Sequence, residues 1–277
     1  MKPKRLQIRY PLVSTAIKQG GFVPSQSQLQ KANEFFNKCQ TKLSFMVFNS
    51  SQLKQSGIKP EVMLLGRSNV GKSSLISALM YPHGKDKTSQ HIKELARSSA
   101  RPGFTKSLNF YNCGDKLYVV DSPGYGHRST GEQGSIVTQY LEAQRNLRRI
   151  YILIDGVVGI TDNDRATMAM IDGSGVPWQI VLTKLDKHIN RPVDYAKLFG
   201  YPESGSKNIP GISEKDIQTI NWTVQRMLEE VEEMIDQGYG SLVEEVIGTS
   251  SNVTLNYLGI KELRASILQS CSFKGFI

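Results

Sequence analysis

The sequence predicts an α/β fold with a mixed, mostly parallel six-stranded sheet and helices on both of its faces. Short, continuously apolar runs typical of buried strands alternate with segments in which apolar residues recur at helical spacing. One pair of strands is joined by the tight turn Gly114-Asp115, which indicates a hairpin and therefore a single antiparallel strand. The predicted strands are residues 62–65, 108–113, 116–120, 150–154, 178–182 and 242–247.

Helices are expected between these strands and at both ends of the predicted sheet, because apolar residues there follow a helical period. The long helix near residue 230 carries an acidic stretch, Glu229-Glu230 and Glu232-Glu233, which we interpret as a solvated face rather than a site. The expected helices are residues 27–40, 74–80, 136–147, 164–171, 214–236 and 259–268.

The length of 277 residues suits one large domain with extensions. No run of about eighteen apolar residues occurs, so no membrane span is expected. The formal net charge is +9, but six Lys and Arg residues precede the first acidic residue, Glu34, which leaves only +3 for the rest. Composition therefore neither demands nor excludes an RNA partner. The three cysteines lack metal-ligand or redox spacing, so we expect reduced thiols.

Three segments are predicted along the chain. Residues 1–24 contain Lys and Arg but no acid, which favours a mitochondrial targeting leader; the alternative is a basic tail that contacts RNA or nothing. Residues 25–60 form an N-terminal extension with a short helix, and residues 61–270 form the main domain. A long surface insertion is expected at about residues 188–213, where prolines and glycines gather.

The stretch from Gly66 to Ser73 fits the phosphate-binding pattern G-x-x-x-x-G-K-[ST]. An apolar strand precedes it and a helix follows, so the helix N-terminus faces the phosphates. The two glycines let the backbone curl, and its N–H groups then point at phosphate oxygens. Lys72 is expected to reach the β- and γ-phosphates, and the Ser73 hydroxyl to ligate Mg²⁺.

Two further motifs follow at the carboxyl ends of later strands, where such sheets bind ligands. Asp121-Ser122-Pro123-Gly124 is expected to hold Mg²⁺ through the Asp121 carboxylate and to present the Gly124 N–H to the γ-phosphate. Thr183-Lys184-Leu185-Asp186 is expected to select guanine, because the carboxylate accepts from both guanine N1–H and the exocyclic amino group. A backbone N–H of residues 248–251 is expected to meet guanine O6.

These motifs and the residues around them resemble the EngB family of TRAFAC-class GTPases, whose fold is the G domain of the P-loop NTPases. The likeness spans roughly residues 45–268, and the N-terminal extension makes the chain most similar to organellar members. The segments that carry the resemblance are residues 60–76, 95–99, 102–105, 121–126, 140–141, 149–155 and 181–187.

The resemblance implies specific roles for residues of this chain. Thr105 is the first-switch threonine that ligates Mg²⁺ together with Ser73 and Asp121. The candidate catalytic residues are Lys72, Thr105 and Asn69. The residues expected to bind the nucleotide are Gly66, Arg67, Ser68, Asn69, Val70, Gly71, Lys72, Ser73, Ser74, Asp121, Gly124, Thr183, Lys184, Asp186, Ser250 and Ser251.

The resemblance also implies a GTPase that binds GTP or GDP with Mg²⁺ and acts as a molecular switch. Bacterial members act in assembly of the large ribosomal subunit. The expected partner is therefore a mitochondrial ribosomal subunit, bound through rRNA or ribosomal proteins in the matrix, during assembly or translation. The expected form is a monomer.

Tyr125 occupies the position where many GTPases place a glutamine that orients the attacking water, so intrinsic hydrolysis should be slow. The alternative function is a GTP-dependent ribosome- or RNA-binding module with negligible turnover. Two interpretations of Asn69 remain open. Its side-chain carbonyl oxygen would help to hold K⁺ beside the phosphates, as in related GTPases. Alternatively, Asn69 only shapes the loop. Without K⁺, Arg97, Arg101 or an arginine from a partner would supply positive charge.

Overall fold

The computed structural model of the chain describes residues 15–17, 22–39, 41–55, 58–80, 107–125, 131–143, 146–189, 214–251 and 257–276. The predicted first-switch residue Thr105 and the nearby Arg97 and Arg101 lie outside the described residues. Residues 190–213, which make up most of the predicted insertion, lie outside them as well. In the part of the chain that is described, no helix is both long and apolar enough to cross a membrane.

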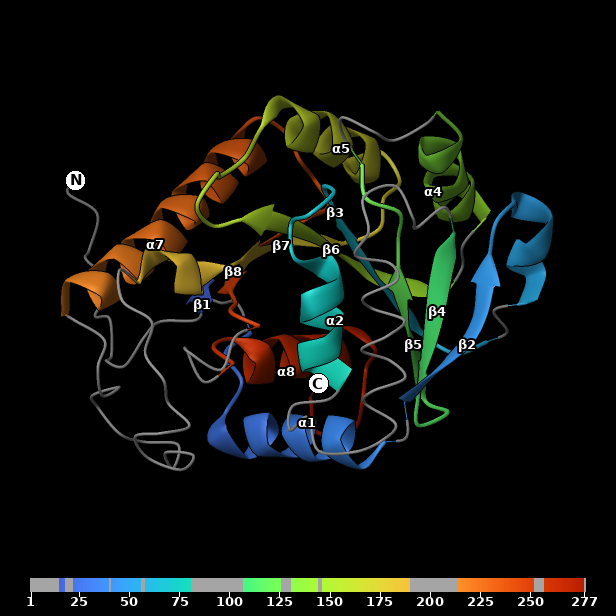
Figure 1. The fold of residues 1–277 in the computed structure, drawn as a ribbon, viewed down its shortest axis with the longest axis horizontal. Helices are drawn as coiled ribbons and strands as arrows, with labels where there is room; N and C mark the ends of the chain where they lie inside the picture. Colours follow the sequence, from blue (N-terminus) through green and yellow to red (C-terminus); the bar gives the residue numbers. More distant parts are fainter. Residues whose placement is uncertain are drawn as a thin grey trace.

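The described elements alternate between strand and helix, as predicted (Figure 1). The strands are β1 (Thr15–Ile17), β2 (Thr41–Val47), β3 (Glu61–Gly66), β4 (Leu108–Cys113), β5 (Leu117–Asp121), β6 (Leu147–Asp155), β7 (Trp178–Thr183) and β8 (Leu242–Gly248). The helices are α1 (Gln26–Lys38), α2 (Lys72–Met80), α4 (Gly131–Ala143), α5 (Asp162–Asp172), α7 (Glu214–Asp236) and α8 (Ile260–Ser270). Two 3-10 turns span Ser50–Gln55 and Leu185–His188.

The strands form one mixed sheet in the order β1-β8-β7-β6-β3-β5-β4-β2. Strands β8, β7, β6, β3 and β5 run parallel, and β4 pairs antiparallel with β5 through the predicted hairpin. These six strands are the predicted ones, so the predicted fold class is confirmed. Two edge strands extend the sheet beyond the prediction, and both pair antiparallel with their neighbours.

Both edge strands come from the segment before residue 61. Strand β1 lies inside the predicted leader and pairs with β8, with Thr15 opposite Ile247. Strand β2 pairs with β4, and its side chains alternate between inward and outward positions, the pattern of a half-covered edge strand. Phe45 of β2 stacks on Phe110 of β4 with ring centroids 4.4 Å apart. The extension therefore contributes directly to the sheet.

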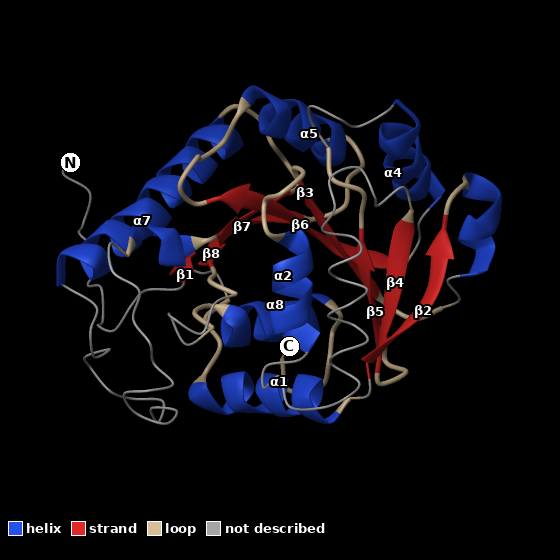
Figure 2. Ribbon diagram, in the orientation of Figure 1, coloured by secondary structure: helices blue, strands red, loops and turns tan. Residues whose placement is uncertain are grey.

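Helices cover both faces of the sheet, as the sequence predicted (Figure 2). Helices α4, α5 and α7 pack on one face, in a core that includes Met63, Ile152 and Ile180. Helices α1, α2 and α8 belong to the opposite core, which includes Leu64 and Leu153. Neighbouring residues of one strand thus enter different cores, because side chains alternate along a strand. Most residues of the central strands are consequently both apolar and buried.

The helix predicted over residues 136–147 ends earlier than expected. Helix α4 stops at Ala143, and Leu147 is instead the first residue of β6, opposite Glu61 of β3. Leu147 is apolar and buried in either assignment, so its hydrophobicity cannot locate the boundary. The pairing of Leu147 with β3 places this residue in the strand.

Helix α1 of the extension is fixed at its start by a capping box. The Ser25 hydroxyl accepts from the Gln28 N–H at 3.2 Å, and the Gln28 side chain accepts from the Ser25 N–H at 2.9 Å. Its buried residues Ala32 and Phe36 join the core formed with α2 and α8. The extension is therefore packed against the main domain.

Arg264 of α8 joins three helices although its side chain is fully buried. Its guanidinium donates to Leu79 O at the end of α2 and to Asn33 Oδ1 and Asn37 Oδ1 of α1. It also lies 5.3 Å from the Phe36 ring centroid. Burial lowers the pKa of Arg264 to about 10, so it stays charged at neutral pH. Two carbonyls in the last turn of α2, those of Ala78 and Leu79, thereby gain a donor.

Replacing Arg264 with methionine should lower the free energy of unfolding by about 3 kcal/mol or more, because several buried acceptors lose their donor. Urea denaturation of the purified protein measures this loss. Arg148→Met, at an exposed arginine, is the matched control and should change stability by less than about 0.5 kcal/mol. Equal effects of the two substitutions would contradict the role given to Arg264.

Candidate nucleotide-binding site

The predicted phosphate-binding loop connects β3 to α2 at the carboxyl edge of the sheet. Asn69 and Gly71 adopt left-handed backbone conformations, with φ of 65° and 104°. Gly66 is packed so tightly that a Cβ there would lie 2.8 Å from Val70 Cγ1. Helix α2 starts at Lys72, directly after the loop. Because the first N–H groups of a helix have no partner within it, this end of α2 favours an anion.

The Asp121–Tyr125 segment runs beside this loop. Ser68 N donates to Tyr125 O at 3.1 Å, and Tyr125 N donates to Gly66 O at 3.3 Å. A Cβ on Gly124 would lie 3.0 Å from the Ser68 nitrogen, so a larger residue would push the two segments apart. The structure thus places the two motifs that were predicted to contact the γ-phosphate side by side.

Lys72 and Asp121 form a buried ion pair between these segments. Lys72 Nζ lies 3.3 Å from Asp121 Oδ1, and both side chains are less than a tenth exposed. Asn109 Nδ2 approaches the other carboxylate oxygen at 3.5 Å. Beyond the Lys72 ion pair, Asp121 Oδ1 accepts no hydrogen bond from the described residues. A buried carboxylate oxygen of this kind fits a Mg²⁺ site, and Ser73, which follows Lys72 at the start of α2, is the predicted hydroxyl ligand.

The base-recognition motif follows β7 and lines a cavity of about 480 Å³. Ser250 Oγ donates to Asp186 Oδ1 at 2.9 Å, so the predicted supporting serine does contact the carboxylate. The cavity reaches the phosphate-binding loop at Gly71. It is lined by Gly71, Ser74, Thr183, Lys184, Asp186, Lys187, Ser251 and Tyr257.

Lys184 is held by a residue that the sequence analysis missed. Its backbone is left-handed, with φ of 60°, and its Nζ lies 2.8 Å from Asp155 Oδ2. Burial raises the pKa of Asp155, but hydrogen bonds from Lys184 and from the Val157 and Val158 N–H groups outweigh it and lower the pKa. Asp155 is the last residue of β6, at the edge of the sheet where such folds bind ligands. Its position at a strand end could have identified it from the sequence.

Thr183 connects the base-recognition motif to the phosphate-binding loop. Its hydroxyl donates to Val70 O at 2.6 Å, and Ile154 O, 3.2 Å from the hydroxyl oxygen, shares the same proton. The polar side chain is buried, and both of its acceptors are main-chain carbonyls, one in a loop and one near a strand end. The two parts of the candidate site are therefore fixed relative to each other.

The Tyr125 side chain points toward α5. Its hydroxyl donates to Asp164 Oδ1 at 2.8 Å, and Arg67 Nε lies 3.1 Å from the same oxygen. Asp164 Oδ2 in turn accepts from the Thr161 N–H and hydroxyl. Burial raises the pKa of Tyr125, and the adjacent Asp164 charge raises it further. Tyr125 is thus a neutral phenol whose donor is already used.

A strand, a glycine-containing loop and a helix with a buried lysine, next to an aspartate at a strand end, define a P-loop nucleotide-binding domain. The family described as 50S ribosome-binding GTPase matches residues 61–184. A probable GTP-binding protein EngB from Wolbachia sp. subsp. Drosophila simulans is 37% identical over 149 residues, which is 51% of this chain and 71% of that protein. The chain belongs to the EngB family, which confirms the resemblance drawn from its motifs.

Two other relatives are similar over a smaller share of their length. MIOREX complex component 8 of Saccharomyces cerevisiae is 34% identical over 187 residues, 59% of this chain and 58% of that protein. A probable GTP-binding protein EngB from Hyphomonas neptunium is 44% identical over 144 residues, 48% of this chain and 61% of that protein. The chain therefore spans less than two thirds of each of these two proteins.

Asp186→Asn should reduce GTP affinity by well over tenfold and raise the affinity for xanthosine triphosphate. The new amide would place its N–H donor against the guanine 2-amino group, which is also a donor, whereas xanthine carries a carbonyl acceptor at that position. The unpaired groups cost about 1–3 kcal/mol each. Titration calorimetry with both nucleotides measures the exchange. Asp162→Asn, at an exposed aspartate of α5, is the control. Unchanged GTP affinity in Asp186→Asn would remove Asp186 from the site.

Proposed function

We propose that the protein is a GTP-binding and GTP-hydrolysing switch that acts in assembly or translation of the mitochondrial ribosome, at its large subunit. The observation that carries the proposal is the joining of a phosphate site and a base site at one sheet edge. Lys72 and Asp121, which form an ion pair, would make up the first, and Asp186, which accepts from Ser250, would make up the second. The description of the matching family as a ribosome-binding GTPase supports the choice of partner.

Hydrolysis in this site depends on electrostatic stabilisation rather than covalent chemistry. Lys72 would move from Asp121 to the β- and γ-phosphates, where its charge offsets the charge of the transition state. Ser73 and Asp121 would hold Mg²⁺, which neutralises phosphate charge when bound. Gly124 would offer its N–H to the γ-phosphate. Thr105 remains the proposed first-switch ligand, although it lies outside the described residues.

The proposed location in the mitochondrial matrix is supported by the acid-free N-terminus and the similarity to MIOREX complex component 8. We propose that any leader within residues 1–24 is removed before Thr15. Cleavage after β1 would remove its pairing with β8, and Phe22 N also donates to Glu245 Oε1 of β8 at 2.7 Å. Residues 25–60 are the proposed extension of a domain that covers residues 61–270.

Gradient sedimentation of lysates from isolated mitochondria tests the partner and the switch together. The protein should migrate with the large subunit in a non-hydrolysable GTP analogue and as a free monomer in GDP. An Asp186→Asn variant should migrate with the subunit only when the corresponding xanthosine analogue is present. Migration as free protein in every nucleotide would contradict the ribosomal partner, and absence from the mitochondria would contradict the location alone.

A binding module with negligible turnover is the second candidate function. The specific observation that favours it is the bond from the Tyr125 hydroxyl to Asp164, because the phenol cannot also orient a water molecule. Phosphate release measured with and without ribosomal subunits separates the candidates. A switch is stimulated by its subunit, whereas a binding module remains at background in both conditions.

We propose that Asn69 helps to hold K⁺ beside the phosphates. Exchanging Na⁺ for K⁺ at equal ionic strength should then raise turnover several-fold, because the ion would neutralise developing charge. Asn69→Gly removes the side chain yet permits the left-handed backbone, so it should abolish the salt difference while GDP binding survives. Asn69→Ala should do the same with some added backbone strain. Equal rates in both salts with ribosomal subunits present would exclude the ion.

A further inference from the structure

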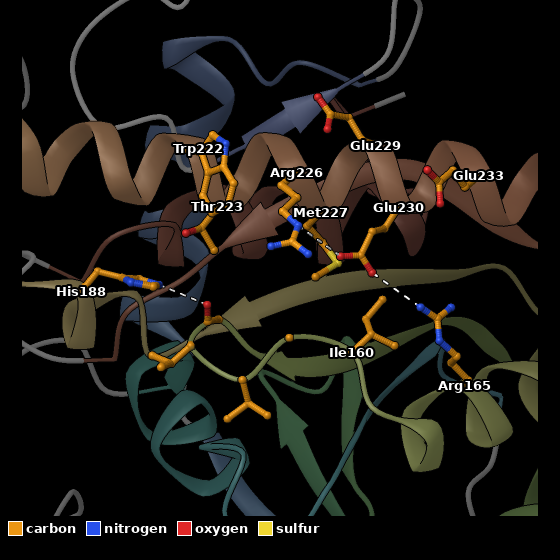
Figure 3. Close-up of a pocket in the computed structure, with 14 residues that line it drawn as sticks. Ile160, Arg165, His188, Trp222, Thr223, Arg226, Met227, Glu229, Glu230 and Glu233 are labelled. Atoms are coloured by element: carbon orange, nitrogen blue, oxygen red, sulfur yellow. Dashed lines mark hydrogen bonds and ion pairs between the residues drawn. The ribbon is translucent and has the colours of Figure 1, made fainter.

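A second cavity, of about 530 Å³, lies between the loop after β6 and one side of α7 (Figure 3). It is separate from the base cavity and is not used by the proposed GTP chemistry. We call it the α7 pocket. It is lined by Gly156, Val157, Val158, Gly159, Ile160, Arg165, His188, Trp222, Thr223, Arg226, Met227, Glu229, Glu230 and Glu233.

Large apolar side chains are exposed at the α7 pocket. Val157 and Val158 are 56% and 59% exposed, and Trp222 is 60% exposed. Burying an exposed tryptophan or valine against a partner is favourable by about 25 cal/mol per Å² of apolar surface. Met227 and Ile160 continue this apolar surface into the pocket (Figure 3). The arrangement suits an apolar or aromatic anchor side chain.

Three glutamates and two arginines surround this apolar surface. Glu230 is the shared acceptor of Arg165 and Arg226, at 3.8 and 3.9 Å, and the Arg226 guanidinium also lies 5.4 Å from the Trp222 ring centroid. Both arginines are therefore engaged. Glu229 and Glu233 line the same pocket and are exposed, and neither has an ion-pair partner among the residues that the structure describes.

We propose that the α7 pocket docks a protein segment in which an apolar or aromatic side chain is flanked by Lys or Arg. The anchor would lie against Trp222 and Val158, and the basic residues would meet Glu229 and Glu233. An RNA strand fits this surface poorly, because its phosphates would face the two unpaired carboxylates. The acidic stretch of α7, interpreted from sequence as a solvated face, thereby acquires a binding role.

The α7 pocket shares a wall with the base-recognition site. His188 Nε2 lies 3.1 Å from Gly156 O, and His188 follows Asp186 by two residues. At the other end of the same loop segment, Asp155 accepts from Val157 N and pairs with Lys184. A segment docked on Val157 and Val158 would therefore contact a loop that the base-recognition residues hold in place.

Selection from a random twelve-residue peptide library on the full-length, GDP-loaded protein tests the proposal without any ribosome. Counter-selection uses the double variant Glu229→Lys/Glu233→Lys. Enriched peptides should carry Lys or Arg on both sides of an apolar or aromatic residue. Because the library also includes acidic and uncharged sequences, enrichment of basic peptides would reflect the surface and not the composition of the library.

Trp222 reports binding directly, because the chain has two tryptophans and the other, Trp178, is fully buried. A selected tryptophan-free peptide should shift the Trp222 emission to shorter wavelength. The Glu229→Lys/Glu233→Lys variant should weaken binding of that peptide at least tenfold and should instead bind its Lys/Arg-to-Glu counterpart. Glu232→Lys/Asp236→Lys has the same charge change and spacing outside the pocket, and should change affinity less than twofold.

Four results would overturn the proposal. They are an equal loss in both double variants, enrichment of acidic peptides, a shift in Trp222 emission with an oligouridylate but not with peptides, and no enrichment over the counter-selected variant.

Replacing residues 191–212 by Gly and Ser at equal length tests a further occupant. Greater acrylamide quenching of Trp222 in that variant would assign the pocket to a segment of the same chain. Concentration-dependent sedimentation without peptide would assign it to a second copy.

Discussion

The hydroxyl of Thr183 fixes the two parts of the site relative to each other. It donates to Val70 O in the phosphate-binding loop, with Ile154 O near the end of β6 sharing the same proton. The strand of Thr183 continues into the base-recognition motif. Parallel strands place their carboxyl ends at one edge of a sheet, so short loops from β3, β6 and β7 converge there. The distance between a phosphate and a base is consequently set by the sheet rather than by flexible segments.

Each of the two lysines in the candidate site is paired with an aspartate. Lys72 pairs with Asp121, and Lys184 pairs with Asp155, so neither lysine is a free buried cation. Asp164 forms an ion pair with Arg67 and also accepts a hydrogen bond from the Tyr125 hydroxyl. This last contact explains why slow intrinsic hydrolysis is expected even though the binding residues are preorganised. In the proposed switch, turnover would then depend on charge supplied by an ion or a partner.

The extension before residue 61 belongs to the fold. Helix α1 is held by Arg264, and strands β1 and β2 complete the two edges of the sheet. Without β1 and β2, strands β8 and β4 would be the edges of the sheet and would present unpaired backbone groups to other chains. Pairing with β1 and β2 satisfies those groups. The apolar residues 43–48 were visible in the sequence, but three-residue β1 lies in a basic segment whose composition favoured a leader. Only the pairing of β1 with β8 identifies β1 as a strand.

The sequence by itself determined the six core strands, the phosphate-binding loop and the residues expected to select the base, because this chemistry is written in contiguous motifs. The tertiary structure decided the pairing of Lys184 with Asp155, the contact of Tyr125 with Asp164 and the anchoring of Arg264 by Asn33, which are 29, 39 and 231 residues apart. It also decided that Glu229 and Glu233 border an exposed apolar pocket. Such contacts depend on how distant elements pack, and no local pattern encodes that packing.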